Sequence, residues 1–279
     1  MSRIIVLGAK GMLGRALVQA WPSHEVAAWD REELDITNAK DVLEKITEQQ
    51  PQIVINAAAY TDVDGAQENR EDAFRVNELG VRNVALAAKQ AGAKLVHFST
   101  DYVFPGDKDS GYLEDDVAGP ALNVYGESKL AGEKALAETG SDYFLIRTAW
   151  LYGAHGKNFV ETMLALGETR KEIAVVNDQH GSPTYAKDLA QFSRELAEGR
   201  YNPGIYHAVN TGVTTWFEFA CRIFELAGKK VTVKPVTSQE FVRPAKRPNW
   251  SFLKNTKGPG MRPWEEALED YLRIGRVAG

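Results

Sequence analysis

The chain has 279 residues, 44% of them apolar, which is enough to bury the core of one large domain or two modest ones. It carries 33 basic and 38 acidic residues with no strongly basic stretch, so nucleic acid is not the expected partner. One cysteine excludes an internal disulfide, and the five histidines show no metal-ligand spacing. We see no signal peptide and no apolar run long enough to span a membrane, and therefore expect a cytoplasmic protein without a membrane partner.

The first half alternates short apolar runs with longer segments of helical spacing. Apolar runs typical of buried parallel strands occur at 4–7, 26–29, 53–56, 95–99 and 144–148. The spacing predicts helices at 12–21, 39–49, 73–91 and 126–139. Regular alternation of strand and helix predicts an α/β fold with a Rossmann-type, doubly wound parallel sheet.

After residue 150 the pattern loosens into a mixture of elements. We expect helices at 158–166, 187–198, 215–227 and 264–274, and strands at 173–176 and 205–209. The proline-rich segment 234–257 is expected to be an ordered but irregular binding segment. We therefore predict an NAD(P)-binding Rossmann domain over 1–148, which also receives 171–200. A smaller α/β substrate-binding domain would comprise 149–170 and 201–279.

A glycine-rich turn joins the first strand to the first helix. Gly8 permits a tight turn, Gly11 lets a pyrophosphate approach the backbone, and Gly14 lets helix and sheet pack closely. The helix N-terminus adds free N–H groups and a positive dipole end. Because the motif stands between a strand and a helix, it predicts dinucleotide binding.

The ends of the second and third strands carry further candidates for cofactor binding. Asp30 would accept hydrogen bonds from the adenosine ribose, whereas Arg31 would pair with a 2′-phosphate, so NADH and NADPH both stay open. Asp35 and Ile36 would flank the adenine. The small residues of segment 56–61 would let a flat ligand pass close to the backbone, although they also suit packing alone.

Tyr125 and Lys129 form the central pair of the predicted site. Their i, i+4 spacing puts both on one helix face, where the ammonium would lower the pKa of the phenol. Tyr125 would then give a proton to a carbonyl oxygen that hydride addition makes basic. Ser99 and Thr100 end the fourth strand, and either hydroxyl could hydrogen-bond that carbonyl or merely cap the strand.

In this order, the motifs resemble those of extended short-chain dehydrogenases/reductases, and more narrowly those of the dTDP-4-dehydrorhamnose reductases. The stretches that carry the resemblance are 8–14, 56–64, 97–106, 120–133, 147–152, 177–184 and 247–251. They run nearly from end to end of the chain. The resemblance implies reduction of the C4 keto group of dTDP-4-dehydro-β-L-rhamnose to dTDP-L-rhamnose by NADPH or NADH.

The resemblance also implies roles for individual residues. Tyr125 would be the proton donor, Lys129 would hold the nicotinamide ribose, and Thr100 would complete the catalytic set. The cofactor would be surrounded by Gly11, Met12, Leu13, Asp30, Asp35, Ile36, Ala59, Tyr60 and Thr61. The nucleotide-sugar substrate would meet Thr100, Asp101, Tyr102, Trp150, Arg247 and Trp250, with Arg247 at its diphosphate end.

The chain departs in one feature from the pattern of the family that it resembles. Some members dimerise through a Mg²⁺ site built from glutamates, one of which follows the glycine-rich turn. Arg15 stands at that place here, and Asp188 is the only near match to another of those positions. We therefore expect no bound metal, and either a monomer or a metal-free homodimer.

Two other functions stay open on the sequence. A nucleotide-sugar epimerase or dehydratase would hold NAD⁺ tightly and regenerate it, but a dehydratase typically needs an acidic pair near the tyrosine, and Tyr102 follows Asp101 here. The same fold also serves as a non-catalytic regulatory subunit, similar to the beta subunit of methionine adenosyltransferase. The Tyr125 and Lys129 pair argues for an enzyme.

Overall fold

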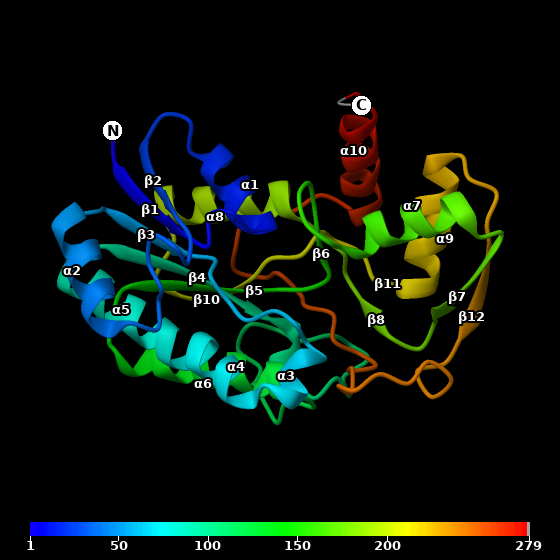
Figure 1. Ribbon diagram of the computed structural model, residues 1–279, viewed down its shortest axis with the longest axis horizontal. Helices are drawn as coiled ribbons and strands as arrows, with labels where there is room; N and C mark the ends of the chain where they lie inside the picture. The colour runs from blue at the N-terminus through cyan, green and yellow to red at the C-terminus, as the bar shows by residue number, and fades with distance from the viewer. Residues whose placement is uncertain (278–279) are drawn as a thin grey trace.

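A six-stranded parallel sheet forms the centre of the computed structural model, which describes residues 1–277. Its strands run in the order β10-β5-β4-β3-β1-β2, with β1 between β2 and β3 (Figure 1). They are β1 (Arg3–Leu7), β2 (Glu25–Trp29), β3 (Ile53–Asn56), β4 (Lys94–Thr100), β5 (Tyr143–Thr148) and β10 (Gly204–His207). The predicted doubly wound α/β sheet is confirmed.

Helices cover both faces of this sheet, which explains why its strands are apolar runs without alternation. Ile4 and Val6 of β1 pack into one buried cluster, while Ile5 and Leu7 pack into another on the opposite face. The first face is covered by α1 (Met12–Ala20) and α8 (Ala186–Glu198). The second is covered by α2 (Ala39–Gln49), α5 (Val81–Gln90) and α6 (Val124–Glu138) (Figure 1).

The helix predicted over 73–91 is not one regular helix. After the short α3 (Gly65–Glu68) and α4 (Arg70–Phe74), the chain forms a π-helical segment, η1 (Arg75–Gly80), before α5 begins. Gly80 packs so closely on Ile36 that a Cβ there would lie 2.7 Å from the Ile36 side chain. Such widened turns inside helices occur often at functional sites.

A second, smaller part gathers at one end of the sheet around its own aromatic core (Figure 1). Tyr152, Phe219, Trp264 and Tyr271 belong to that buried cluster. Its helices are α7 (Phe159–Thr169), α9 (Trp216–Ala227) and α10 (Trp264–Val277). Its two-stranded ladders pair β7 (Glu172–Val176) with β12 (Thr232–Val236), β8 (His180–Gly181) with β11 (Thr214–Thr215), and β6 (Leu151–Tyr152) with β9 (Thr184–Tyr185).

Four strand pairings cross the predicted domain boundaries, namely β10 with β5, β7 with β12, β8 with β11 and β9 with β6. β10, within 201–279, pairs with β5 of the central sheet, and β7, within 171–200, pairs with β12 of the smaller part. The segment 234–257 also begins inside β12 and is irregular only beyond it. That irregular stretch returns to the larger part through isolated bridges such as Asp107 with Trp250. In the part of the chain described here, no helix combines the length and apolar character needed to cross a bilayer.

Candidate active site

A cavity of about 850 Å³ opens at the carboxyl ends of the central strands, where ligands bind in this architecture. It is bordered by both parts of the molecule, because Trp150 and Trp216 line it together with the strand ends of the sheet. All predicted cofactor residues lie along it: Gly8, Gly11, Met12, Leu13, Gly14, Asp30, Arg31, Asp35, Ile36, Ala59, Tyr60 and Thr61. The predicted catalytic residues Thr100, Tyr125 and Lys129 line the same cavity.

The glycine-rich turn is shaped to receive a pyrophosphate. Gly8 has a φ of +73°, and a Cβ there would lie 2.7 Å from the backbone nitrogen of Ala58. A Cβ on Gly14 would lie 2.0 Å from the carbonyl oxygen of Gly8, whereas one on Gly11 would meet that oxygen only at 3.3 Å. Gly8 and Gly14 thus allow close packing, and Gly11, as N-cap of α1, leaves helix N–H groups open to an anion.

Asp30 is held in place at the end of β2 by two backbone amides. Its Oδ2 accepts from the Lys10 amide at 2.9 Å, and its Oδ1 accepts from the Arg31 amide at 2.8 Å. The Arg31 side chain is 75% exposed and pairs with Asp35 at 3.3 Å. Lys10 also lines the cavity and pairs with Glu32, a role that sequence reasoning missed, although the residue lies inside the glycine motif. A carboxylate and two cations thus border one end of the cavity.

The loop after β3 is fixed by a side chain that the sequence analysis did not single out. The Tyr60 amide donates to Asn77 Oδ1 at 2.9 Å, and Asn77 Nδ2 donates to the Tyr60 carbonyl at 3.0 Å. The same Nδ2 donates to the Ser128 hydroxyl at 2.9 Å, next to Lys129. Asn77 is 1% exposed and comes from the π-helical segment. It ties the loop after β3 to the helix that carries Tyr125 and Lys129.

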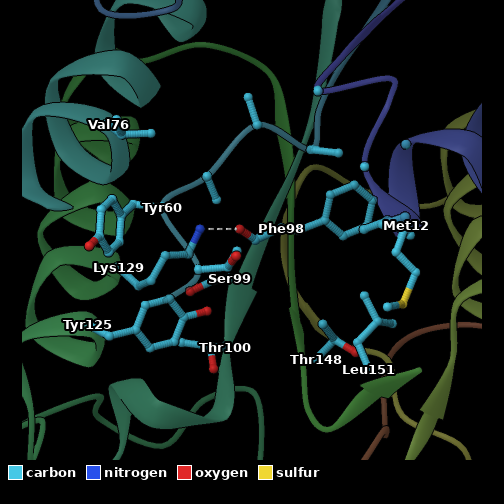
Figure 2. A pocket seen from close by; sticks show the side chains of 18 of the residues that line it. Met12, Tyr60, Val76, Phe98, Ser99, Thr100, Tyr125, Lys129, Thr148 and Leu151 are labelled. Carbon is cyan, nitrogen blue, oxygen red and sulfur yellow. Dashed lines mark hydrogen bonds between the residues drawn. The ribbon is translucent and has the colours of Figure 1, made fainter. Parts of the chain in front are cut away.

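Tyr125 and Lys129 lie near the start of α6, whose N-cap Asn123 accepts from the Gly126 amide at 2.8 Å. Lys129 is 3% exposed, and its Nζ donates to the Phe98 carbonyl at 2.6 Å (Figure 2). Burial lowers the Lys129 pKa to about 8. The cation at the base of the cavity is therefore held by a strand carbonyl.

Burial also sets the pKa of the Tyr125 phenol, which it raises to about 12. The Thr100 hydroxyl next to the phenol opposes this shift (Figure 2). The sequence analysis expected the Lys129 ammonium to lower this pKa, but the net shift is upward, because burial is the largest effect on the phenol and Lys129 Nζ donates to the Phe98 carbonyl. At neutral pH the phenol therefore keeps its proton, as a proton donor must.

Thr100 and Asp101 form a buried hydrogen-bonded chain beside the phenol. The Thr100 hydroxyl donates to Asp101 Oδ1 at 2.9 Å, and the Ser251 hydroxyl donates to Asp101 Oδ2 at 2.6 Å. Burial raises the pKa of the Asp101 carboxyl to about 7. The Thr100 hydroxyl thus links the phenol to the Asp101 carboxyl, and its oxygen also accepts from the Tyr102 amide at 3.2 Å.

The Ser99 hydroxyl, which the sequence analysis considered as a donor to a substrate carbonyl, is hydrogen-bonded within the protein instead. Its hydroxyl donates to Glu133 Oε1 at 2.5 Å. Glu133 is also bound in bidentate fashion by Arg147, at 3.0 and 2.7 Å, and both charged side chains are almost fully buried. This ion pair braces β5 against α6, so the hydroxyl available to a ligand is that of Thr100.

The six predicted substrate residues are not all at the cavity. Thr100, Asp101, Tyr102 and Trp150 line it, whereas Arg247 and Trp250 do not.

Arg247 and Trp250 lie instead in the irregular segment 237–257, which returns from the smaller part to the larger part. Arg247 pairs with Asp64, lowering the pKa of that carboxyl to about 2, and also lies against Tyr102. The Trp250 ring is stacked on His180 with centroids 3.6 Å apart. Arg247 is thus next to a cavity residue, one contact away from the cavity itself.

Asp188, the near match to a metal-binding position of the family, has partners within its own chain. Both carboxylate oxygens of Asp188 accept from Arg262, at 2.8 Å each, and one also accepts from Asn210 at 2.8 Å. Within residues 1–277, His, Cys, Asp and Glu side chains form no group of three or more suited to a metal ion. Asp188 is therefore engaged within its own chain.

Comparison with known proteins now identifies the family. The model of the family described as RmlD substrate binding domain matches residues 2–276. The chain belongs to this family. Its relatives include the spore coat polysaccharide biosynthesis protein SpsK of Bacillus subtilis, 42% identical, with 98% of each chain covered. They also include the dTDP-4-dehydrorhamnose reductase of Escherichia coli, 40% identical, with 91% of this chain and 90% of that protein covered.

Solved structures of similar proteins share the fold. The dTDP-4-dehydrorhamnose reductase of Bacillus anthracis, solved in complex with NADP, has a TM-score of 0.95 and 44% identity and covers 98% of this chain and 99% of its own. A UDP-glucose 4-epimerase of Thermus thermophilus with NAD has a TM-score of 0.78 at 22% identity, with 99% of this chain and 100% of the epimerase covered. At that identity the epimerase shows only that the fold is shared.

Proposed function

We propose that this protein is a dTDP-4-dehydrorhamnose reductase. It would reduce the C4 keto group of dTDP-4-dehydro-β-L-rhamnose with NADPH or NADH and release dTDP-L-rhamnose. The observation that carries the proposal is the single cavity that joins the glycine-rich turn to Thr100, Tyr125 and Lys129. Reductases of this name across the RmlD family, about two fifths identical over nearly the whole chain, support the substrate assignment.

The residues along the cavity fit a nicotinamide dinucleotide. Gly11 and the start of α1 would hold its pyrophosphate, and Asp30 would accept from its adenosine ribose. Lys10 and Arg31 place two cations where the 2′-phosphate of NADPH would be neutralised, so we expect NADPH to be accepted. When bound, the reduced cofactor supplies the hydride for the sugar carbon.

Tyr125 supplies the proton that balances this hydride. As the C4 carbonyl carbon gains the hydride, its oxygen takes the proton from the Tyr125 phenol, and a hydroxyl group results. The Lys129 ammonium would stabilise the phenolate that is left, and Thr100, whose hydrogen bond lowers the Tyr125 pKa, would orient the phenol. The protein thus aligns and polarises the carbonyl, while the redox chemistry belongs to the cofactor.

The sugar and nucleotide ends of the substrate would meet different segments. Asp101, Tyr102 and Trp150 border the cavity beside the catalytic set and would contact the sugar. Arg247, which lies against Tyr102, would bind the diphosphate, where a guanidinium fork fits phosphate oxygens. Trp250, three residues further on, would pack against the base or the sugar.

The test is to mix purified protein with dTDP-4-dehydrorhamnose and follow the absorbance of NADPH and NADH in parallel. We expect stoichiometric oxidation with formation of dTDP-L-rhamnose. Tyr125→Phe should lower kcat by about 10²- to 10⁴-fold, the usual contribution of a general acid, and leave NADPH affinity nearly unchanged. Tyr143→Phe, at the far end of β5, is the matched control and should keep its turnover.

Other results would point to the other functions. Interconversion of sugars without net cofactor oxidation would indicate an epimerase or dehydratase. A stable complex with a larger enzyme and no turnover alone would indicate a regulatory subunit. Normal turnover in Tyr125→Phe would refute the proposed proton donor.

We further propose a cytoplasmic protein that is either a monomer or a metal-free homodimer. Arg15 follows the glycine-rich turn, and Asp188 is neutralised by Arg262, so neither position offers a free carboxylate to a bridging cation. Sedimentation with and without a chelator should give the same mass, and a mass that falls on chelation would refute this.

A further inference from the structure

Trp150 has a backbone conformation that bulky residues rarely adopt. Its φ is +47°, in the left-handed region, two residues after the end of β5 and at the edge of the cavity. Such a conformation persists only where the surroundings fix it, and it concentrates at ligand sites. The contacts around the Trp150 side chain show what fixes it.

Gly181 lies directly over one face of the Trp150 indole. A Cβ on Gly181 would lie 2.5 Å from Cε2 and 2.7 and 2.8 Å from Cζ2 and Nε1. Cε2 is bonded to both of the other atoms and is nevertheless the nearest, so the approach is perpendicular to the ring. An approach within the ring plane would meet Cζ2 and Nε1 first.

Trp216 covers the other face. Its ring is stacked on Trp150 with centroids 3.7 Å apart and an interplanar angle of 12°. Cε2 lies on the bond shared by the two rings of the indole, so a ring stacked this closely and the backbone of Gly181 cannot share one face. Phe159 packs against Trp216 from α7, with centroids 4.5 Å apart, and thereby supports the stack.

We propose that Gly181 and Trp216 are positioning residues that clamp the Trp150 indole, so that the substrate's sugar meets its edge and not its face. This inference rests on the proposed function, in which Trp150 contacts the sugar. It assigns the orientation of Trp150 to two residues of the smaller part, one on β8 and one at the start of α9.

The clamp determines which side of a sugar Trp150 selects. An aromatic face carries partial negative charge and favours the C–H bonds of a sugar ring, whereas an aromatic edge carries partial positive charge and favours oxygen. With both faces covered, the indole presents its edge to the oxygen-bearing side of the substrate. Trp216 would therefore act on specificity through Trp150.

The activity test compares Trp216→Leu with Trp216→Phe. Loss of a stacked aromatic pair is worth up to about tenfold, so Trp216→Leu should raise the KM for the nucleotide sugar about three- to tenfold. The NADPH dissociation constant should not change. Trp216→Phe keeps a stacked ring and should restore most of the loss.

Two further variants separate clamping from general packing. Phe217→Leu makes the same kind of change one residue along α9, at a position that does not line the cavity, and should leave the KM unchanged. In a Trp150→Leu background, Trp216→Leu should add no further rise in KM. Independent, additive effects of the two changes would overturn the inference.

A spectroscopic measurement tests the stack without activity. Two stacked indoles give an exciton-coupled band in the far-ultraviolet circular dichroism spectrum, which should vanish in Trp150→Leu, in Trp216→Leu and in Trp216→Phe. The band should persist in Phe217→Leu. Its absence from the unaltered protein would overturn the clamp.

The outcomes distinguish the inference from the proposed function. If the unaltered protein reduces the sugar and Trp216→Leu keeps the same KM, the clamp is refuted and the function stands. If the unaltered protein oxidises no cofactor, the function fails, and calorimetric binding of dTDP-L-rhamnose decides the inference. A weaker affinity in Trp216→Leu than in Phe217→Leu would support the clamp, and equal affinities would refute it.

Discussion

The titration of Lys129 should set the upper pH limit of turnover. Its pKa is lowered from 10.5 to about 8 by burial, whereas that of Tyr125 is raised to about 12, so of this pair only the lysine changes charge as pH rises past neutrality. The Asp101 carboxyl, with a pKa of about 7, ionises mainly at the lower end of the same pH range. With a pKa of about 8, roughly 90% of Lys129 is protonated at pH 7 and roughly 10% at pH 9. Because the ammonium stabilises the developing phenolate, kcat/KM should fall about tenfold between these values.

The assay is the initial rate of NADPH oxidation with limiting nucleotide sugar, measured from about pH 6 to about pH 10. Lys129→Arg keeps a positive charge throughout this range, because guanidinium does not deprotonate in proteins. The variant should be slower, since the guanidinium cannot reproduce the contact with the Phe98 carbonyl, but it should lose the alkaline decline. A flat profile for the unaltered protein, or an unchanged decline in Lys129→Arg, would refute the reasoning.

The titration of Lys129 does not destabilise the folded protein over the pH range in which kcat/KM should decline. The folded pKa of about 8 lies below the reference value of 10.5, so between these values the unfolded chain binds more protons than the folded one. The contribution of Lys129 to the free energy of unfolding therefore rises with pH across that window, while activity falls. Thermal unfolding midpoints measured at the same pH values separate the two effects.

Three other variants test the surroundings of the cavity. Arg31→Ala should raise the KM for NADPH about tenfold and leave that for NADH nearly unchanged in steady-state assays, because only NADPH offers a 2′-phosphate. Glu133→Gln should lower the free energy of unfolding by about 3–5 kcal/mol in urea titrations, because it leaves the buried Arg147 cation unpaired. Asp64→Asn should lower the thermal unfolding midpoint at neutral pH, because it removes the ion pair with Arg247 that holds the Asp64 pKa at about 2. The stabilisation from this pair is lost as pH falls through that value, so near pH 2 the variant should match the unaltered protein. An unchanged NADPH KM, an unchanged urea midpoint or a pH-independent difference would contradict these expectations in turn.

The central sheet could be predicted because its physical cause is visible locally. A strand covered on both faces needs apolar residues along its length, so 4–7 and 53–55 stand out as uninterrupted apolar runs. The glycine-rich turn was equally readable, because Gly8 and Gly14 meet close contacts that any side chain would block. Each of these signals belongs to one short stretch of chain.

The π-helical segment could not be predicted for the opposite reason. It brings Asn77 to the backbone of Tyr60, a contact across 17 positions of the chain, and to Ser128, across 51. Spacing within 73–91 is compatible with a regular helix, and only the partners outside that range favour the wider turn. A buried amide on the packed face of a predicted helix was the one available sign.

Tyr125 and Lys129 show that a spacing can predict the position of two side chains correctly and still mispredict the direction of a pKa shift. The i, i+4 spacing correctly places Tyr125 and Lys129 on one helix, but it cannot show that β4 offers the Phe98 carbonyl to the ammonium. Because that carbonyl holds the lysine and burial dominates both groups, the phenol stays protonated and the lysine becomes the titrating member. Spacing can therefore predict which side chains share a helix face, whereas their protonation at neutral pH depends on burial and on the strand that packs against that helix.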